Sequence, residues 1–167
     1  TPTVGRVLFK GQAQEGRTAA EAHTARLAIQ MIFQDPFASL NPRSRVEMVV
    51  GEAPLVHGMT TRAGLSACVD DILRRVGLDP ELKRRYPHQF SGGQRSRIGI
   101  ARALAVKPEF LVCDEAIAAL DVSIQAQIIN LFMDLRTEFD LTYLFISHDL
   151  GVVQHITDRV VIMYLGR

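Results

Sequence analysis

Residues 110–115 read Phe-Leu-Val-Cys-Asp-Glu, four consecutive apolar side chains directly before two acids. An apolar run of this length that ends in polar residues is typical of a strand buried on both faces of a sheet. Residues 29–33 and 141–147 have the same character, and amphipathic helical spacing fills much of the sequence between them. Buried strands that alternate with helices form parallel sheets, so the sequence predicts an α/β fold with both faces of the sheet covered.

The spacing of apolar residues predicts helices over 65–78 and from Ser91 to about 106. Asp121 stands where a capping residue is expected, in front of a long amphipathic helix. Two further strands are predicted at 6–10 and 160–163, the second of them apolar throughout.

Composition indicates one globular domain of 167 residues, with 47% hydrophobic and 22% charged residues. The formal net charge of +1 gives no overall field that would attract nucleic acid or an anionic membrane. Cys68 and Cys113 are too far apart for a disulfide framework, which indicates a reducing, cytosolic setting. No apolar run approaches the roughly 18 residues of a membrane span, and residues 1–6 lack a signal-peptide pattern. We therefore expect any membrane association to come through a partner.

Polar side chains follow three predicted strands, at the edge where parallel sheets place their chemistry. Gln34 follows the first, Asp114 and Glu115 the second, and His148 the third. One carboxylate could hold Mg²⁺ through water while its neighbour orients or deprotonates an attacking water. The imidazole could donate to a phosphate, and the Gln34 amide could reach a metal or a water. The plainer alternatives are an acidic strand exit, a histidine bonded to the loop backbone and a loop-forming glutamine.

Ser91, Gly92, Gly93 and Gln94 open a predicted helix and allow two interpretations. Ser91 and Gln94 have the spacing of a capping box. The two glycines expose backbone N–H groups at the positive end of the helix dipole, which suits a phosphate. The four residues alone do not decide between the two.

Taken in order, these motifs resemble the ABC ATPase family, which has a P-loop NTPase-like parallel sheet with an inserted helical subdomain. Residues 90–95 look like the family signature, 110–115 like its Walker B strand, 119–121 like the D-loop and 146–149 like the switch-histidine loop. The resemblance covers nearly the whole chain, with the helical subdomain at about 46–105. Residues 34–42, 121–127 and 143–150 are similar to oligopeptide, dipeptide and nickel importer ATPases.

The resemblance implies ATP hydrolysis with Mg²⁺ between two head-to-tail cassettes. The implied catalytic residues are Glu115, His148 and Gln34. The residues implied to bind Mg²⁺ are Asp114 and Gln34. The residues implied to contact the nucleotide and the dimer interface are Ser91, Gly92, Gly93, Gln94 and Asp121. The implied partners are a second ABC ATPase subunit, transmembrane permease subunits and, indirectly, an external solute-binding protein, with no nucleic acid. The implied location is the cytoplasmic face of the bacterial inner membrane.

The sequence also departs from the family. No Gly-x-x-x-x-Gly-Lys-Ser/Thr loop occurs in the 167 residues, so we expect a partial cassette that lacks its N-terminal part. Such a chain is expected not to bind or hydrolyse ATP normally, and its unpaired strand edges predict a marginally stable, oligomeric or rearranged protein. Ala116, Ile117 and Ala118 replace a proline and a serine that family members usually carry, and Ser96 replaces a frequent glutamine.

Two other functions fit part of the pattern. One is a non-catalytic module that docks on a permease or on a complete cassette. The other is a non-transport ABC ATPase that acts on DNA or the ribosome. The short interval between Gln34 and Ser91 disfavours DNA-repair types, which carry a long coiled coil there.

Overall fold

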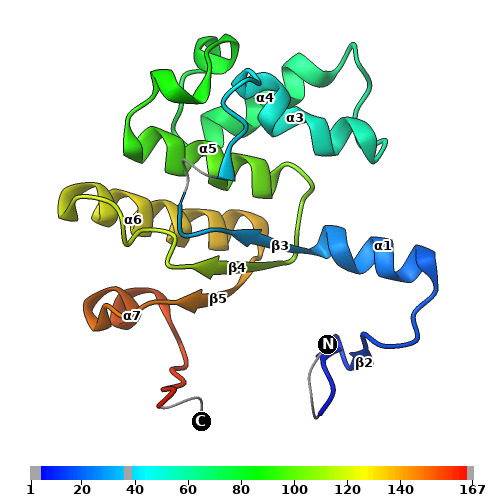
Figure 1. The fold of residues 1–167 in the computed structure, drawn as a ribbon, viewed down its shortest axis with the longest axis vertical. Coiled ribbons are helices and arrows are strands. Elements are labelled where there is room, and N and C mark those ends of the chain that lie inside the picture. The colour runs from blue at the N-terminus through cyan, green and yellow to red at the C-terminus, as the bar shows by residue number, and fades with distance from the viewer. Residues whose placement is uncertain (1–4, 36–38, 165–167) are drawn as a thin grey trace.

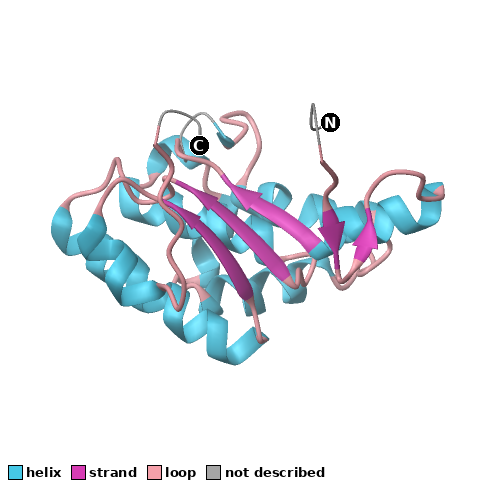
Figure 2. Ribbon diagram, turned by 90° about the horizontal axis from the view of Figure 1, so that it is seen from below, coloured by secondary structure: helices cyan, strands magenta, loops and turns pink. Residues whose placement is uncertain are grey.

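A computed structural model describes residues 5–35 and 39–164, and within them the chain is an α/β protein. The central sheet has three parallel strands in the order β3 (Ile29–Ile32), β4 (Phe110–Asp114) and β5 (Thr142–Ile146). Figure 2 shows these strands side by side and running in the same direction. The predicted fold class and its three central strands are confirmed.

Figure 1 shows the α-helices of the described residues. They are α1 (Ala19–Ala28), α3 (Val46–Val56), α4 (Leu65–Arg75), α5 (Gly92–Leu104), α6 (Val122–Phe139) and α7 (Leu150–Ile156). Short 3₁₀ turns at Pro80–Arg84 and Pro87–Gln89 lead into α5, and α3, α4 and α5 form one layer at the top of Figure 1. No helix of the described residues has the length and apolar character needed to cross a bilayer.

One face of the sheet is packed into the core. On β4, Leu111 and Cys113 are fully buried, and they lie in register with Tyr143 and Phe145 of β5. Both aromatic rings meet Phe132 of α6 edge to face, at centroid distances of 5.5 Å. The Tyr143 hydroxyl also donates to the Phe132 carbonyl at 2.9 Å. The long amphipathic helix is therefore the main cover of this face.

The opposite face is open in the described part of the chain. Met31 of β3 is 37% exposed, and Leu144 and Ile146 of β5 are 49% and 44% exposed. Successive residues of a strand point to opposite faces, so these three share the face that Tyr143 and Phe145 do not use. The prediction that both faces are covered is wrong for these residues, because none of the described helices packs there.

The prediction of a strand at residues 160–163 is also wrong. Residues 160–163 form no strand, and their side chains are 57% to 88% exposed. A strand requires a partner for its backbone groups, and no other strand of the described residues lies beside this segment. The predicted strand at 6–10 shortens to β1 (Leu8–Phe9), paired antiparallel with β2 (Gln12–Ala13) away from the main sheet. The boundaries of the helical subdomain stay a prediction.

Candidate functional site

Three of the predicted catalytic side chains meet at the carboxyl ends of the parallel strands. Gln34 follows β3, Glu115 follows β4 and His148 follows β5. Gln34 donates through Nε2 to Glu115 Oε2 at 2.5 Å, and His148 Nδ1 lies 3.0 Å from Glu115 Oε1. Each oxygen of one carboxylate therefore has its own neighbour, although the three residues are far apart in sequence.

The backbone holds Glu115 in an unusual conformation. Its φ is +45°, in the left-handed region that non-glycine residues rarely adopt. Its N–H donates to the Ile146 carbonyl at 3.0 Å, which extends the contact between β4 and β5 by one residue. After it, Ala116 and Ile117 are buried, and Gln125 of α6 donates through Nε2 to the Ile117 carbonyl at 3.1 Å. The turn after β4 is thus anchored on both sides, and it directs the Glu115 carboxylate toward Gln34 and His148.

Asp114, the last residue of β4, is half-buried beside this cluster. Asp114 and Gln34 both line a cavity of about 760 Å³. Gln34 uses its amide nitrogen toward Glu115, so its amide oxygen is available to another ligand. A carboxylate and an amide oxygen on one cavity fit Mg²⁺, which binds few protein oxygens and keeps waters or phosphate oxygens. No cluster of three or more His, Cys, Asp or Glu side chains that could hold a metal occurs among the described residues.

His148 lies in the loop between β5 and α7, directly before the residue that caps α7. Asp149 caps α7, accepting from Gly151 N at 2.8 Å and Val152 N at 3.4 Å, and its own N–H donates to Ser147 Oγ. The His148 side chain is 73% exposed while that of Glu115 is 28% exposed. The imidazole can therefore meet a ligand from solvent while it stays in contact with the carboxylate.

The N-terminus of α5 forms the predicted capping box. Gln94 N–H donates to Ser91 Oγ at 3.3 Å, and Ser91 N–H donates to Gln94 Oε1 at 3.1 Å. The capping interpretation is thus confirmed. It does not compete with the phosphate interpretation, because the box uses the amides of Ser91 and Gln94 and not those of the two glycines.

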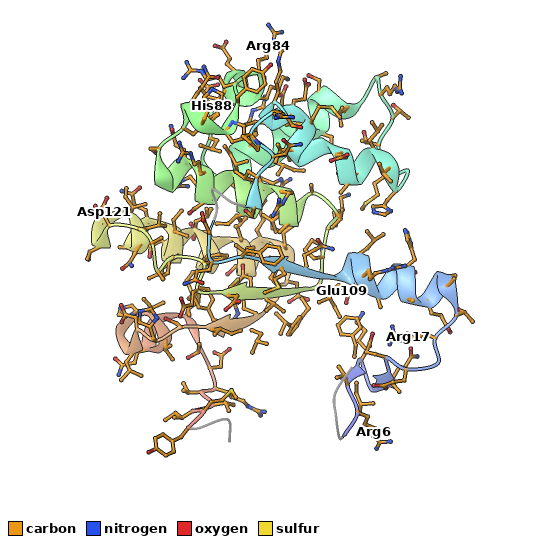
Figure 3. All side chains as sticks on the ribbon, viewed as in Figure 1. Arg6, Arg17, Arg84, His88, Glu109 and Asp121 are labelled. Carbon is orange, nitrogen blue, oxygen red and sulfur yellow. The ribbon has the colours of Figure 1, made fainter. Side chains whose placement is uncertain are left out.

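The two glycines lie against the start of α6. A Cβ on Gly92 would stand 3.6 Å from Leu120 Cδ2, whereas one on Gly93 would stand 2.7 Å from Ile124 Cγ2. The N-termini of α5 and α6 therefore meet, which brings Ser91–Gln94 beside Asp121 (labelled in Figure 3). Asp121 occupies the cap position of α6, but its side chain makes no capping hydrogen bond. The expectation that it caps through its side chain is wrong, since only its carbonyl accepts, from Ile124 N and Gln125 N.

No role in the site was predicted from the sequence for Arg102 or Gln125. Arg102 of α5 donates to the Ser39 carbonyl just beyond the Gln34 segment, and burial lowers the pKa of this guanidinium. It lines the same cavity as Gln34 and Asp114. The available signal for Arg102 was a cation inside an otherwise apolar stretch of a helix, and that for Gln125 was its place in the importer-like segment 121–127. Residues 36–38 of the motif after Gln34 lie outside the described residues.

Comparisons with known proteins agree on one family. The sequence profile described as "ABC transporter" matches residues 1–118. The chain is 55% identical to the oligopeptide transport ATP-binding protein AppF of Bacillus subtilis, over 99% of this chain and 51% of that protein. It is 52% identical to the dipeptide transport ATP-binding protein DppF of Lactococcus lactis, over 99% of this chain and 53% of that protein. The chain thus spans about half the length of these curated relatives.

Solved structures give the same fold. The structure of CbiO1 from Clostridium perfringens, part of an ABC transporter complex, superimposes with a TM-score of 0.79 and 29% identity, over 93% of this chain and 61% of that one. The dimeric post-hydrolysis ATP-binding cassette MJ0796, bound to ADP and phosphate, gives a TM-score of 0.76 and 28% identity, over 92% and 67%.

Proposed function

Because the chain belongs to the ABC transporter family, we propose that it forms part of an ATP-hydrolysing subunit that drives import of peptides or similar small solutes. The observation that carries this proposal is the contact of one carboxylate, Glu115, with both Gln34 and His148 at the ends of three adjacent strands. The printed names of the relatives, oligopeptide and dipeptide transport proteins among them, support the substrate class.

In this proposal the Glu115 carboxylate orients the water that attacks the γ-phosphate of ATP. A carboxylate that accepts from Gln34 is held in one orientation, so it can align a water without reorganising at the moment of reaction. His148 is the more exposed partner, and its outer ring nitrogen is free to reach a phosphate oxygen. The chemistry is mainly positioning and charge stabilisation, as phosphoryl transfer requires.

Asp114 and Gln34 are the residues proposed to hold Mg²⁺. When bound, this ion would neutralise charge on the phosphate oxygens. Asp114 supplies the carboxylate, and Gln34 supplies the amide oxygen that its bond to Glu115 leaves available. Gln34 would therefore sense the metal and the catalytic carboxylate together.

Ser91, Gly92, Gly93 and Gln94 are proposed to act on the nucleotide of a second ATPase subunit. The glycine amides open α5 at the positive end of its dipole, and the neighbouring Asp121 side chain has no capping role that would occupy it. The dimeric, ADP-bound state of MJ0796 supports a two-subunit arrangement. Transmembrane permease subunits and an external binding protein complete the proposed assembly at the cytoplasmic face of the inner membrane.

The test is the steady-state ATPase rate of the purified protein that contains this chain, assembled with its permease. Glu115→Gln keeps the size of the side chain but cannot accept a proton, so we expect the rate to fall by about 10²–10⁴-fold. Nucleotide binding is expected to persist, because the substitution removes a base and not a phosphate ligand.

Glu109→Gln is the matched control. Glu109, labelled in Figure 3, directly precedes β4 at the opposite end of the strand from Glu115. It forms an ion pair with Lys10. Its substitution should leave turnover within about twofold, because exposed ion pairs contribute little. Equal rates in the two variants would refute the role of Glu115, and absence of turnover in the unsubstituted protein would refute the ATPase proposal.

A further inference from the structure

Two histidines from distant parts of the chain meet on the surface, away from the proposed catalytic site. His23 lies on α1, and His57 is the residue at which α3 ends. His23 Nε2 is 2.9 Å from His57 Nδ1, and the rings meet edge to face with centroids 4.8 Å apart. Among the described residues this is the only hydrogen bond between α1 and α3. Both side chains are exposed, so an ion from solvent can reach the nitrogens.

We propose that His23 and His57 form a binding site for a divalent first-row transition metal. Imidazole nitrogen is a preferred ligand of Cu²⁺, Ni²⁺ and Zn²⁺. Two bonds of about 2.0–2.1 Å place their nitrogens about 2.9 Å apart at the right angle of tetragonal Cu²⁺ or Ni²⁺, and about 3.3 Å apart at the tetrahedral angle of Zn²⁺. The observed separation of 2.9 Å matches the first geometry and needs to open by only about 0.4 Å for the second, which exposed side chains allow.

The hydrogen now shared by the two nitrogens does not prevent binding. A neutral imidazole carries one hydrogen, and it can carry it on either nitrogen. Transfer of the bridging hydrogen to the outer nitrogen of its own ring leaves both facing nitrogens as acceptors. The ion then replaces the hydrogen between the rings, and water completes its coordination, since the described residues offer no cluster of three ligands.

A bound ion would fasten α1 to the end of α3. Figure 1 shows α1 extending from the start of β3 toward one side of the molecule, away from the centre of the sheet. A ligand that binds only the folded state stabilises it by RT ln(1 + L/Kd), where L is the free ligand concentration, so the stabilisation grows with the logarithm of that concentration once it exceeds Kd. The metal would thus raise the stability of the attachment of α1, and this inference does not depend on the proposed ATPase function.

The experiment titrates the purified, tag-free protein with Cu²⁺, the divalent ion that such sites bind most tightly. Calorimetry should give one Cu²⁺ per chain, and electron paramagnetic resonance should show hyperfine coupling to two nitrogens. His23→Asn and His57→Asn each remove one ligand, so each should weaken binding by at least about tenfold. His155→Asn is the matched control, because His155 is another exposed histidine, and its Nδ1 lies 2.9 Å from the Gly151 carbonyl oxygen.

Three results would overturn the proposal. They are a signal with fewer than two nitrogens in the unsubstituted protein, unchanged affinity in either variant of the pair, or an equal loss in the His155→Asn control. The resonance spectrum of the unsubstituted protein tests the site even if a variant folds poorly.

Discussion

Replacing Gly93 with alanine tests how tightly α5 and α6 pack at the proposed nucleotide edge. The added Cβ would lie 2.7 Å from Ile124 Cγ2, whereas carbon atoms in contact prefer about 3.5–4.0 Å. Ile124 is β-branched, so its Cγ2 cannot swing away without a costly rotamer change. One of the two helices must therefore move.

Gly92→Ala is the reference variant against which the packing cost of Gly93→Ala is measured. Alanine is favoured over glycine in a helix by up to about 1 kcal/mol, and both positions share that gain. At Gly92 the new Cβ would meet Leu120 Cδ2 at an ordinary 3.6 Å, so this variant should be as stable as the parent or more stable. Overpacking costs about 1–3 kcal/mol, so Gly93→Ala should be less stable than Gly92→Ala by about that amount.

Urea unfolding followed by circular dichroism measures both free energies. Ile124→Ala removes the opposing Cγ2, so the pair Gly93→Ala and Ile124→Ala should show a favourable coupling of about 1 kcal/mol or more in a double-mutant cycle. The denaturant slope should not change. A difference below about 0.5 kcal/mol between the two glycine variants, or zero coupling, would refute the packing argument.

The remaining predictions concern two buried groups. Ser96 is 3% exposed, and its hydroxyl has no hydrogen-bond partner among the described residues, so Ser96→Ala should raise the free energy of unfolding by about 1 kcal/mol in thermal melts. Burial raises the pKa of the Cys113 thiol to about 12, so native Cys113 should not react with a thiol reagent at pH 8 while Cys68 does. The stability that neutral Cys113 contributes is complete below about pH 9 and is lost as pH rises toward 12.

The sequence predicted the strands well because each apolar run ends at a polar residue. β4 and β5 lie within one or two residues of their predicted ends. The same signal failed at 160–163, because an apolar run specifies a tendency to be buried and not the partner that buries it. Leu144 and Ile146 show the same limit of an apolar pattern. Their sequence is typical of a sheet covered on both faces, but the described helices cover only one face.

The candidate site was predictable in its members but not in its contacts. Gln34, Glu115 and His148 follow from the rule that parallel strands gather their carboxyl ends. Their grouping around one carboxylate depends on loop conformations that have no periodic signal. Gly93 shows the converse case, because its sequence suggested a phosphate contact and the structure adds a packing reason for glycine.

Glu115 links the stability of the fold to the proposed chemistry. A left-handed backbone at a non-glycine residue costs about 1–2 kcal/mol, so it persists only where the surroundings stabilise it. Here the Glu115 N–H bonds to the Ile146 carbonyl, and the side chain bonds to Gln34. An extended residue at this position would continue β4 and direct its side chain to one face of the sheet. The strained turn instead aims the carboxylate at the neighbouring strand ends, which is where a water and a phosphate would have to meet.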